Sequence, residues 1–187
     1  RTFFTVIQPS SFPPAFENVA WSLAPNSSNG EGYNLVVEDA TSNLGLGLRV
    51  FGSKVMNYKA DGFTNSKLTS NPFIFTGQSG KNDNVTDTEF HLNGTFLTTT
   101  QASGSAALNT NGLGVVIGGF SNGSDNDPES TFDFNGDIFE LITYSSDLST
   151  TRRIIIENYL SAKYAITLDN NDFYAGDDPA QNDYDMD

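Results

Sequence analysis

The stretch "GDIFELITYSSDLSTTRRIIIENYL", residues 136–160, changes its periodicity in the middle. Up to Ser145 apolar and polar residues roughly alternate, which is typical of a β-strand with two different faces. After Leu148 the apolar residues recur at three- and four-residue spacing, as they do along one face of an α-helix. This stretch therefore predicts a strand, a turn and a helix in succession.

The predicted helix begins after Ser149, whose hydroxyl can accept hydrogen bonds from amides of the first turn. We expect this helix to be held by packing against a sheet. A single helix at the end of a strand-rich chain most simply plugs an open end or edge of the sandwich. Arg152 and Arg153 are expected to project away from the packed face. The residues expected on that face are Ile155, Ile156, Tyr159, Leu160 and Lys163.

The rest of the chain predicts an all-β domain. It has 15 Phe and 7 Tyr, and its short runs of strand-forming residues are separated by clusters of Gly, Asn, Ser and Asp. Asn93-Gly94 in "EFHLNGTFL" predicts a type I′ hairpin, because both turn positions need positive φ. Strands are expected at residues 2–8, 16–24, 33–38, 44–51, 54–59, 72–75, 88–92, 95–99, 114–118 and 137–144.

The charge distribution limits the partners and divides the chain. The net charge of −14 argues against binding to nucleic acid and to anionic membrane surfaces. No apolar run approaches the roughly 18 residues of a membrane span, and the chain has no Cys. Residues 169–187 contain seven Asp and no Lys or Arg, so we expect one domain at residues 1–168 followed by an Asp-rich tail or linker to a following domain.

Four motifs in the second half of the chain carry a family resemblance: "FHLNG", "GVVIGGF", "FNGDIFELITYSSDLS" and "IIIENYLSAKYAITL". Together they resemble the end of LamG-like domains of the concanavalin A-like lectin/glucanase superfamily. The match is good over residues 88–170 and is only a pattern of strands over residues 1–87. Ala165 departs from it, because the pattern has Gly there.

The resemblance implies a two-sheet antiparallel jelly-roll β-sandwich of the concanavalin A-like type, with one C-terminal α-helix. It also implies a module of secreted, multidomain surface proteins of Bacteroidota, and hence an extracellular or cell-surface location beside neighbouring domains. If Ala165 takes positive φ at the end of the helix, it carries a strain of roughly 1 kcal/mol. In the strand before the helix, Ile138, Ile142 and Tyr144 are expected on one face, and we interpret Glu140 as structural.

Enzymatic activity is the minority interpretation. Jelly-roll hydrolases carry an "E.D..E" run, and the nearest sequence here is "TDTEF", with Asp87 and Glu89 on one strand face. Jelly-roll lyases use a Gln-x-His pair and a Tyr, and here "NYKADG" is only a faint match for the Tyr context. The only His in the chain is His91, which we interpret as a surface or cross-strand residue.

Calcium is the metal that the composition favours, because oxygen ligands are abundant while Cys is absent and His is single. Two Asp-rich segments, residues 124–133 and 176–187, could supply ligands, and neither matches the EF-hand loop. Such segments are more often solvated. The candidate ligands are Asp125, Asp127, Glu129, Asp133, Asp177, Asp178, Asp183 and Asp185.

Glycan binding would use an aromatic ring on which the C–H face of a sugar stacks. The candidates are Tyr58, Phe63, Phe73 and Trp21, although Trp21 in "ENVAWSLA" fits better in a core strand. The first hypothesis is therefore a non-catalytic recognition module for a polysaccharide or cell-surface glycan. The alternatives are a structural or protein-interaction spacer of an adhesin and, less favoured, a glycoside hydrolase or polysaccharide lyase.

Overall fold

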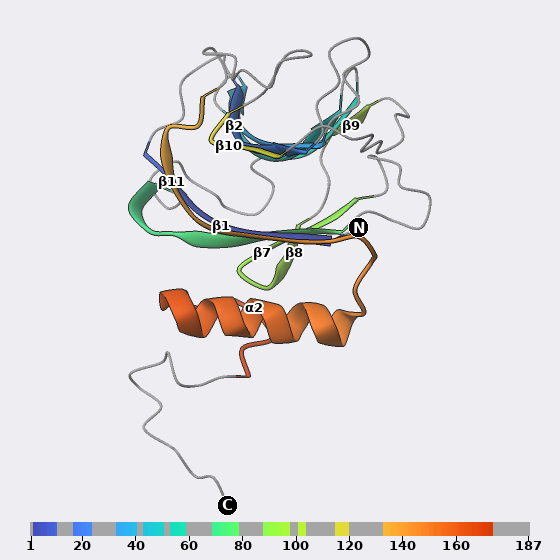
Figure 1. Ribbon diagram of the computed structural model, residues 1–187, viewed down its shortest axis with the longest axis vertical. Coiled ribbons are helices and arrows are strands. Elements are labelled where there is room, and N and C mark those ends of the chain that lie inside the picture. Colours follow the sequence, from blue (N-terminus) through green and yellow to red (C-terminus); the bar gives the residue numbers. More distant parts are fainter. Residues whose placement is uncertain are drawn as a thin grey trace, which may run out of the picture.

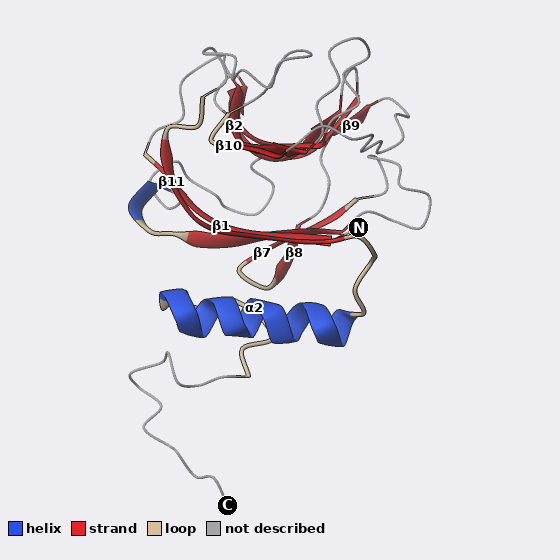
Figure 2. Cartoon of the chain, in the orientation of Figure 1, coloured by secondary structure: helices blue, strands red, loops and turns tan. Residues whose placement is uncertain are grey.

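The computed structural model stacks two antiparallel β-sheets, with one long helix on the outer side of one sheet (Figures 1 and 2). The layer order is therefore sheet, sheet, helix. The structure describes residues 2–10, 17–23, 33–40, 43–50, 53–58, 69–78, 88–97, 101–103, 115–119 and 133–173.

Strand order within each sheet follows the pairing of sequence-distant segments. The five-stranded sheet has the order β11 (Gly136–Tyr144), β1 (Thr2–Pro9), β6 (Phe73–Gln78), β7 (Glu89–Leu92) and β8 (Thr95–Leu97). The six-stranded sheet has the order β10 (Val115–Ile117), β2 (Glu17–Leu23), β3 (Tyr33–Ala40), β4 (Asn43–Val50), β5 (Ser53–Tyr58) and β9 (Gln101–Ser103). The expected sandwich is confirmed, and β9 is a strand that the sequence did not predict.

Aromatic side chains fill the space between the sheets. The rings of Phe3 and Trp21 meet edge to face, with centroids 5.0 Å apart, and those of Phe75 and Phe90 stack at 5.3 Å. The indole N–H of Trp21 donates to the Thr5 hydroxyl at 2.8 Å, so its one polar atom is satisfied inside the core. Trp21 is fully buried, which agrees with its interpretation as a core residue.

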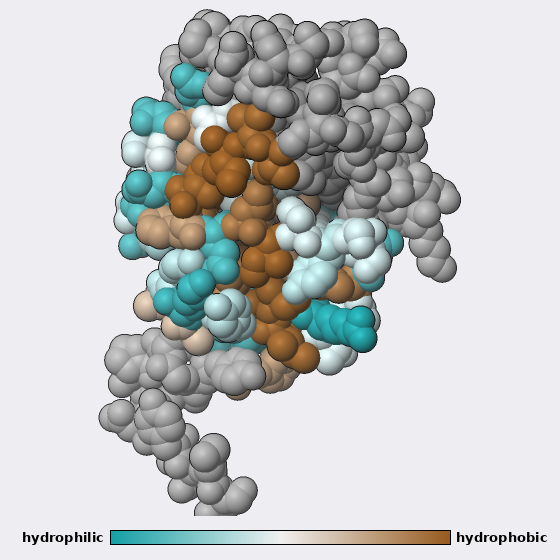
Figure 3. Space-filling model, viewed as in Figure 1, coloured by the Kyte–Doolittle hydropathy of each residue, from teal (hydrophilic) through white to brown (hydrophobic). Residues whose placement is uncertain are grey.

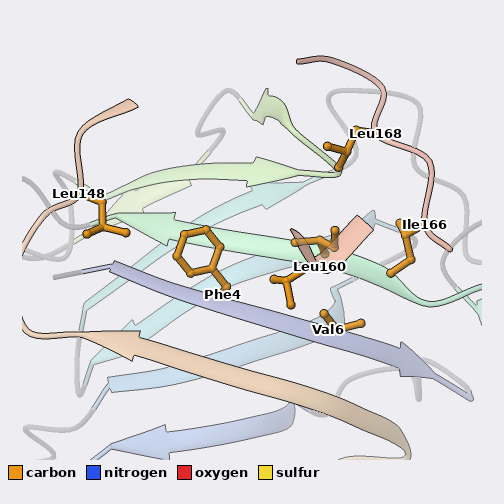
Figure 4. Close-up of a cluster of buried hydrophobic side chains, with 7 residues drawn as sticks. Phe4, Val6, Leu148, Leu160, Ile166 and Leu168 are labelled. Atoms are coloured by element: carbon orange, nitrogen blue, oxygen red, sulfur yellow. The ribbon is translucent and has the colours of Figure 1, made fainter. Parts of the chain in front are cut away.

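The second core lies between the outer face of the five-stranded sheet and helix α2 (Thr150–Tyr164). Phe4, Val6 and Ile74 project from β1 and β6, and Leu148, Leu160, Ile166 and Leu168 cover them from the helix and its flanks (Figure 4). The expected packing of the helix against a sheet is confirmed. Because the helix lies flat on the face of that sheet (Figure 1), the expectation that it plugs an open end or edge of the sandwich is wrong. The apolar residues of β1 require this cover, because they alternate between both faces of the strand.

A bulge in β11 changes which residues share a face. The pairing with β1 shifts between Val6 and Ile7, so Ile142 lies opposite Phe4 while Ile138 lies opposite Ile7. The expectation that Ile138 shares a face with Ile142 is therefore wrong, because a bulge reverses the alternation beyond it.

The buried face of α2 is also rotated from the expected one. Leu160 is buried and Ile156 is partly buried, but Ile155 and Tyr159 are 54% and 51% exposed. Arg153 is instead buried, together with Glu157. The predicted N-cap is confirmed, because the Ser149 hydroxyl accepts from the amide of Arg152.

Candidate functional site

A pocket of about 550 Å³ opens where the C-terminal end of α2 meets the ends of β6 and the β7–β8 hairpin. Its volume lies within the range of small-ligand sites. The lining residues come from three separate parts of the chain, and they are Asn71, Pro72, Phe73, Leu92, Asn93, Tyr164, Ala165, Ile166, Thr167 and Asp169.

The hairpin turn forms one wall. Asn93 and Gly94 have φ of 45° and 79°, which confirms the predicted type I′ geometry. The side-chain oxygen of Asn93 accepts from the backbone amide of Ile74, and the backbone amide of Asn93 donates to the Ile74 carbonyl, both at 2.9 Å. A Cβ at Gly94 would lie 2.4 Å from the carbonyl oxygen of Asn170, so only glycine allows the chain after the helix to approach this turn.

The end of the helix forms the opposite wall. Ala165 adopts the left-handed conformation, with φ 52° and ψ 45°, and reverses the chain. The Ile166 amide then donates to the Ser161 carbonyl at 3.1 Å, while the Ser161 hydroxyl donates to the Ile166 carbonyl at 2.6 Å. The amide of Asp169 donates to the carbonyl of Asn93 at 2.9 Å, which joins the two walls.

The Tyr164 ring is held in place by its surroundings. Its hydroxyl lies 3.0 Å from Glu140 Oε2 and 3.2 Å from the Phe139 carbonyl. Lys163 donates to the same Glu140 oxygen at 2.9 Å, and this hydrogen bond raises the pKa of Lys163. Desolvation is the first cause that raises the pKa of Tyr164. Glu140 thus ties β11 to α2, as its structural interpretation expected.

The lining suits hydrogen bonding to hydroxyl groups. Asn71 and Asn93 bring amides, Thr167 brings a hydroxyl, Asp169 brings a carboxylate and Tyr164 brings an aromatic ring. Asp169 is the only carboxylate among these residues, whereas glycoside hydrolysis needs two that face the scissile bond. The arrangement can therefore bind a polyhydroxylated ligand, but it does not hold a carboxylate pair.

A second polar group lies beneath the helix, outside the pocket. Arg153 Nη1 and Glu157 Oε2 are 2.6 Å apart, with side chains 8% and 1% exposed. The pKa of His91 is lowered to about 4, first by burial and second by the nearby charge of Arg153. Burial raises the pKa of Glu157, while Arg153 and the Thr76 hydroxyl oppose that shift.

His91 is thus a buried cross-strand residue, paired with Phe96 of β8, so the cross-strand interpretation is confirmed and a surface position is wrong. It is 6% exposed, and its ring meets that of Phe96 edge to face at 5.5 Å. Glu89 is exposed on β7, and Asp87 lies outside the described residues. Because α2 covers His91, a catalytic role for it at the surface has no support in this geometry.

Of the two predicted ligand-binding aromatic residues whose side chains the structure describes, Phe73 lines the pocket, and it is only 2% exposed. Trp21 is enclosed between the sheets, so its ring has no free face for a sugar. Tyr58 ends β5, but its side chain lies outside the part that the structure describes, as does the whole of Phe63. The polar lining residues were missed because isolated Asn, Thr and Asp form no recognisable pattern.

The predicted metal ligands fall mostly outside the described residues. Asp133 is exposed at the surface, and within the described ranges no group of three or more His, Cys, Asp or Glu could hold a metal ion. Those outside the described ranges are Asp125, Asp127, Glu129, Asp177, Asp178, Asp183 and Asp185. Calcium therefore remains a prediction.

Comparison with solved structures finds the same sandwich fold in other proteins. The chain is similar to a heptameric SAP-like pentraxin from Limulus polyphemus, with a TM-score of 0.57 and 16% identity over 88% of this chain and 71% of that chain. It is also similar to the CBM40 domain of the Ruminococcus gnavus IT-sialidase bound to α2,6-sialyllactose, with a TM-score of 0.52 and 16% identity over 83% of this chain and 82% of that one.

A third similarity concerns part of an enzyme. Against the NanB sialidase of Streptococcus pneumoniae the TM-score is 0.53 and the identity 13%, over 81% of this chain but 23% of the sialidase. No family profile matches the sequence, and no curated protein is significantly similar to it. The structural similarities establish a jelly-roll sandwich.

Among the described helices none has the length and apolar character to cross a bilayer.

Proposed function

We propose that this chain is a non-catalytic module that recognises carbohydrate, as part of a larger secreted or cell-surface protein. The observation that carries the proposal is the pocket at the end of α2, where amides, a hydroxyl, a carboxylate and a tyrosine ring meet. Sugars are recognised by such groups, because their hydroxyls need hydrogen-bond partners and their C–H faces stack on rings.

Two features support the proposal. The walls of the pocket are fixed by backbone hydrogen bonds and by the hydrogen bond from the Tyr164 hydroxyl to Glu140. Little conformational entropy is therefore lost when a ligand binds. The similar CBM40 structure is a complex with a glycan. We also propose that the chain binds calcium through its Asp-rich segments, because carboxylate oxygen atoms are the ligands that this ion prefers.

A glycan array with the whole chain tests the proposal, with calcium and with EDTA. We expect binding to a defined set of glycans, and Tyr164→Ala should reduce it because the stacking ring is lost. An array without signal under both conditions would refute the proposal. Release of reducing ends from a polysaccharide would show that the chain is an enzyme.

A protein-interaction role is the second candidate, and it rests on the exposed side of α2. Ile155 and Tyr159 project outward, and Phe173 nearby in the sequence is 73% exposed. Figure 3 shows that apolar residues also form a continuous band on one face of the molecule. Substitution of Ile155 and Tyr159 by Ser distinguishes the two roles, because it should leave glycan binding unchanged.

A further inference from the structure

We infer that the pocket selects uncharged sugars and rejects sugars that carry a carboxylate, sulfate or phosphate group. This inference rests on the proposed function and specifies the ligand class of the same site. It follows from the sign of the charge in and around the pocket.

The described lining contains one ionisable side chain that is charged near neutral pH, the carboxylate of Asp169, and no Lys, Arg or His. Recognition of an anionic group in proteins normally uses a guanidinium or an ammonium group. One base lies close to the pocket, because Lys163 Nζ is 5.1 Å from the centre of the Tyr164 ring that lines it. The same Nζ lies 2.9 Å from Glu140 Oε2, which offsets its charge.

The whole chain adds to this effect. Its net charge is −14, and an anionic ligand would approach a negative surface before it reached Asp169. Like charges brought together at a binding site lower both affinity and association rate. An uncharged sugar avoids this cost.

The polar side chains that line the pocket can form hydrogen bonds with the hydroxyl groups of an uncharged sugar. The Asp169 carboxylate accepts from sugar hydroxyls, and such charge-assisted hydrogen bonds are stronger than neutral ones. Its backbone amide donates to the carbonyl of Asn93, which places residue 169 at the wall of the pocket. The amide of Asn71 and the hydroxyl of Thr167 both donate and accept, which matches hydroxyl groups of either orientation.

This ligand class differs from that of the similar CBM40 domain, which was solved with sialyllactose, a sugar that bears a carboxylate. A shared sandwich does not imply a shared ligand, because specificity depends on the site residues. This chain and the CBM40 domain would therefore share a fold and bind different classes of sugar.

The test is an array of matched pairs, in which each neutral oligosaccharide stands beside its sialylated, sulfated and uronic acid-containing forms. We expect the wild-type chain to bind neutral members at least tenfold more strongly than their anionic partners. Asp169→Asn should weaken the neutral signal by about tenfold, because the charge-assisted hydrogen bonds are lost. Asp169→Lys should raise the anionic signal several-fold.

Asp137→Asn is the matched control. Asp137 is exposed on β11 and is not among the residues that line the pocket, so the variant changes the net charge equally and should bind as the wild type does. Melting temperatures of all variants establish that they are folded, which we expect because the Asp169 side chain is exposed and its backbone hydrogen bond persists.

Two failures can be told apart. If no glycan binds, the proposed function fails and this inference falls with it. If glycans bind but the anionic members are preferred, or Asp169→Asn binds as Asp137→Asn does, only the inference is overturned.

Discussion

Ala165 occupies a backbone conformation that glycine adopts at no steric cost. Its φ of 52° ends α2 and turns the chain into the pocket wall. The sequence predicted a strain here, because the family pattern has Gly where this chain has Ala.

Ala165→Gly should therefore raise the free energy of unfolding by up to about 1 kcal/mol, measured by urea denaturation. Ala162→Gly is the matched control, since Ala162 is exposed inside the same helix and its replacement should destabilise by about 0.5–1 kcal/mol. Equal destabilisation by both variants would mean that residue 165 is right-handed in solution.

His91 predicts a loss of stability in mild acid. Its pKa is about 4 in the folded chain and 6.5 as the ordinary value. Between these values the unfolded chain binds a proton that the folded chain does not, so the stability that neutral His91 contributes falls as the pH drops from 6.5 to 4. Glu157 acts in the opposite direction, because its raised pKa makes the folded chain take up a proton first.

His91→Gln should flatten the pH dependence of the urea midpoint across this window. The difference in slope between wild type and variant is at most one proton, or about 1.4 kcal/mol per pH unit. The comparison isolates His91 because the remaining carboxylates titrate in both proteins. Parallel curves would show that His91 becomes protonated without resistance and is not buried.

Helix α2 shows how an element can be predicted while its orientation is not. Its start at Ser149 and its length follow from local signals, and most strands are found within a few residues of their expected positions. The apolar pattern nevertheless favoured Ile155 and Tyr159 for the packed face. The helix instead buries Arg153 and Glu157, which form an ion pair at 2.6 Å. Thr76 and His91 are paired residues of β6 and β7 in the sheet on which the helix lies.

The Arg153–Glu157 pair predicts a non-additive result. Arg153→Leu should destabilise by about 3 kcal/mol, because it leaves Glu157 buried without its partner. The double variant Arg153→Leu, Glu157→Leu should lose much less, since no charge is then buried. Urea denaturation of the two single variants and the double variant measures the coupling. Strictly additive losses would show that the two side chains do not interact.

The bulge in β11 and the pocket are two features that could not be predicted from the sequence. The reversal of Ile138 depends on one extra residue in β11, and no local signal in alternating residues reveals it. The pocket joins residues 71, 93 and 169, whose proximity depends on how the helix lies on the sheet. The type I′ turn was predictable because Asn-Gly has a strong local preference, whereas its contact with Asp169 was not.

At the scale of the whole molecule, calcium can be tested without knowledge of its ligands. An ion that binds the folded chain alone raises the melting temperature with its concentration. We expect calcium to raise the melting temperature and EDTA to reverse the change, while magnesium has a smaller effect because it demands stricter geometry. A melting temperature that is the same in calcium and in EDTA would remove calcium from the account.

The central claim is that this sandwich binds carbohydrate in the pocket between α2 and the β7–β8 hairpin. Backbone amide chemical shifts, recorded by NMR while a glycan bound on the array is titrated, test it most directly. We expect the largest shifts at Asn71, Asn93, Thr167 and Asp169. Shifts confined to other parts of the chain, or none at saturating glycan, would contradict it.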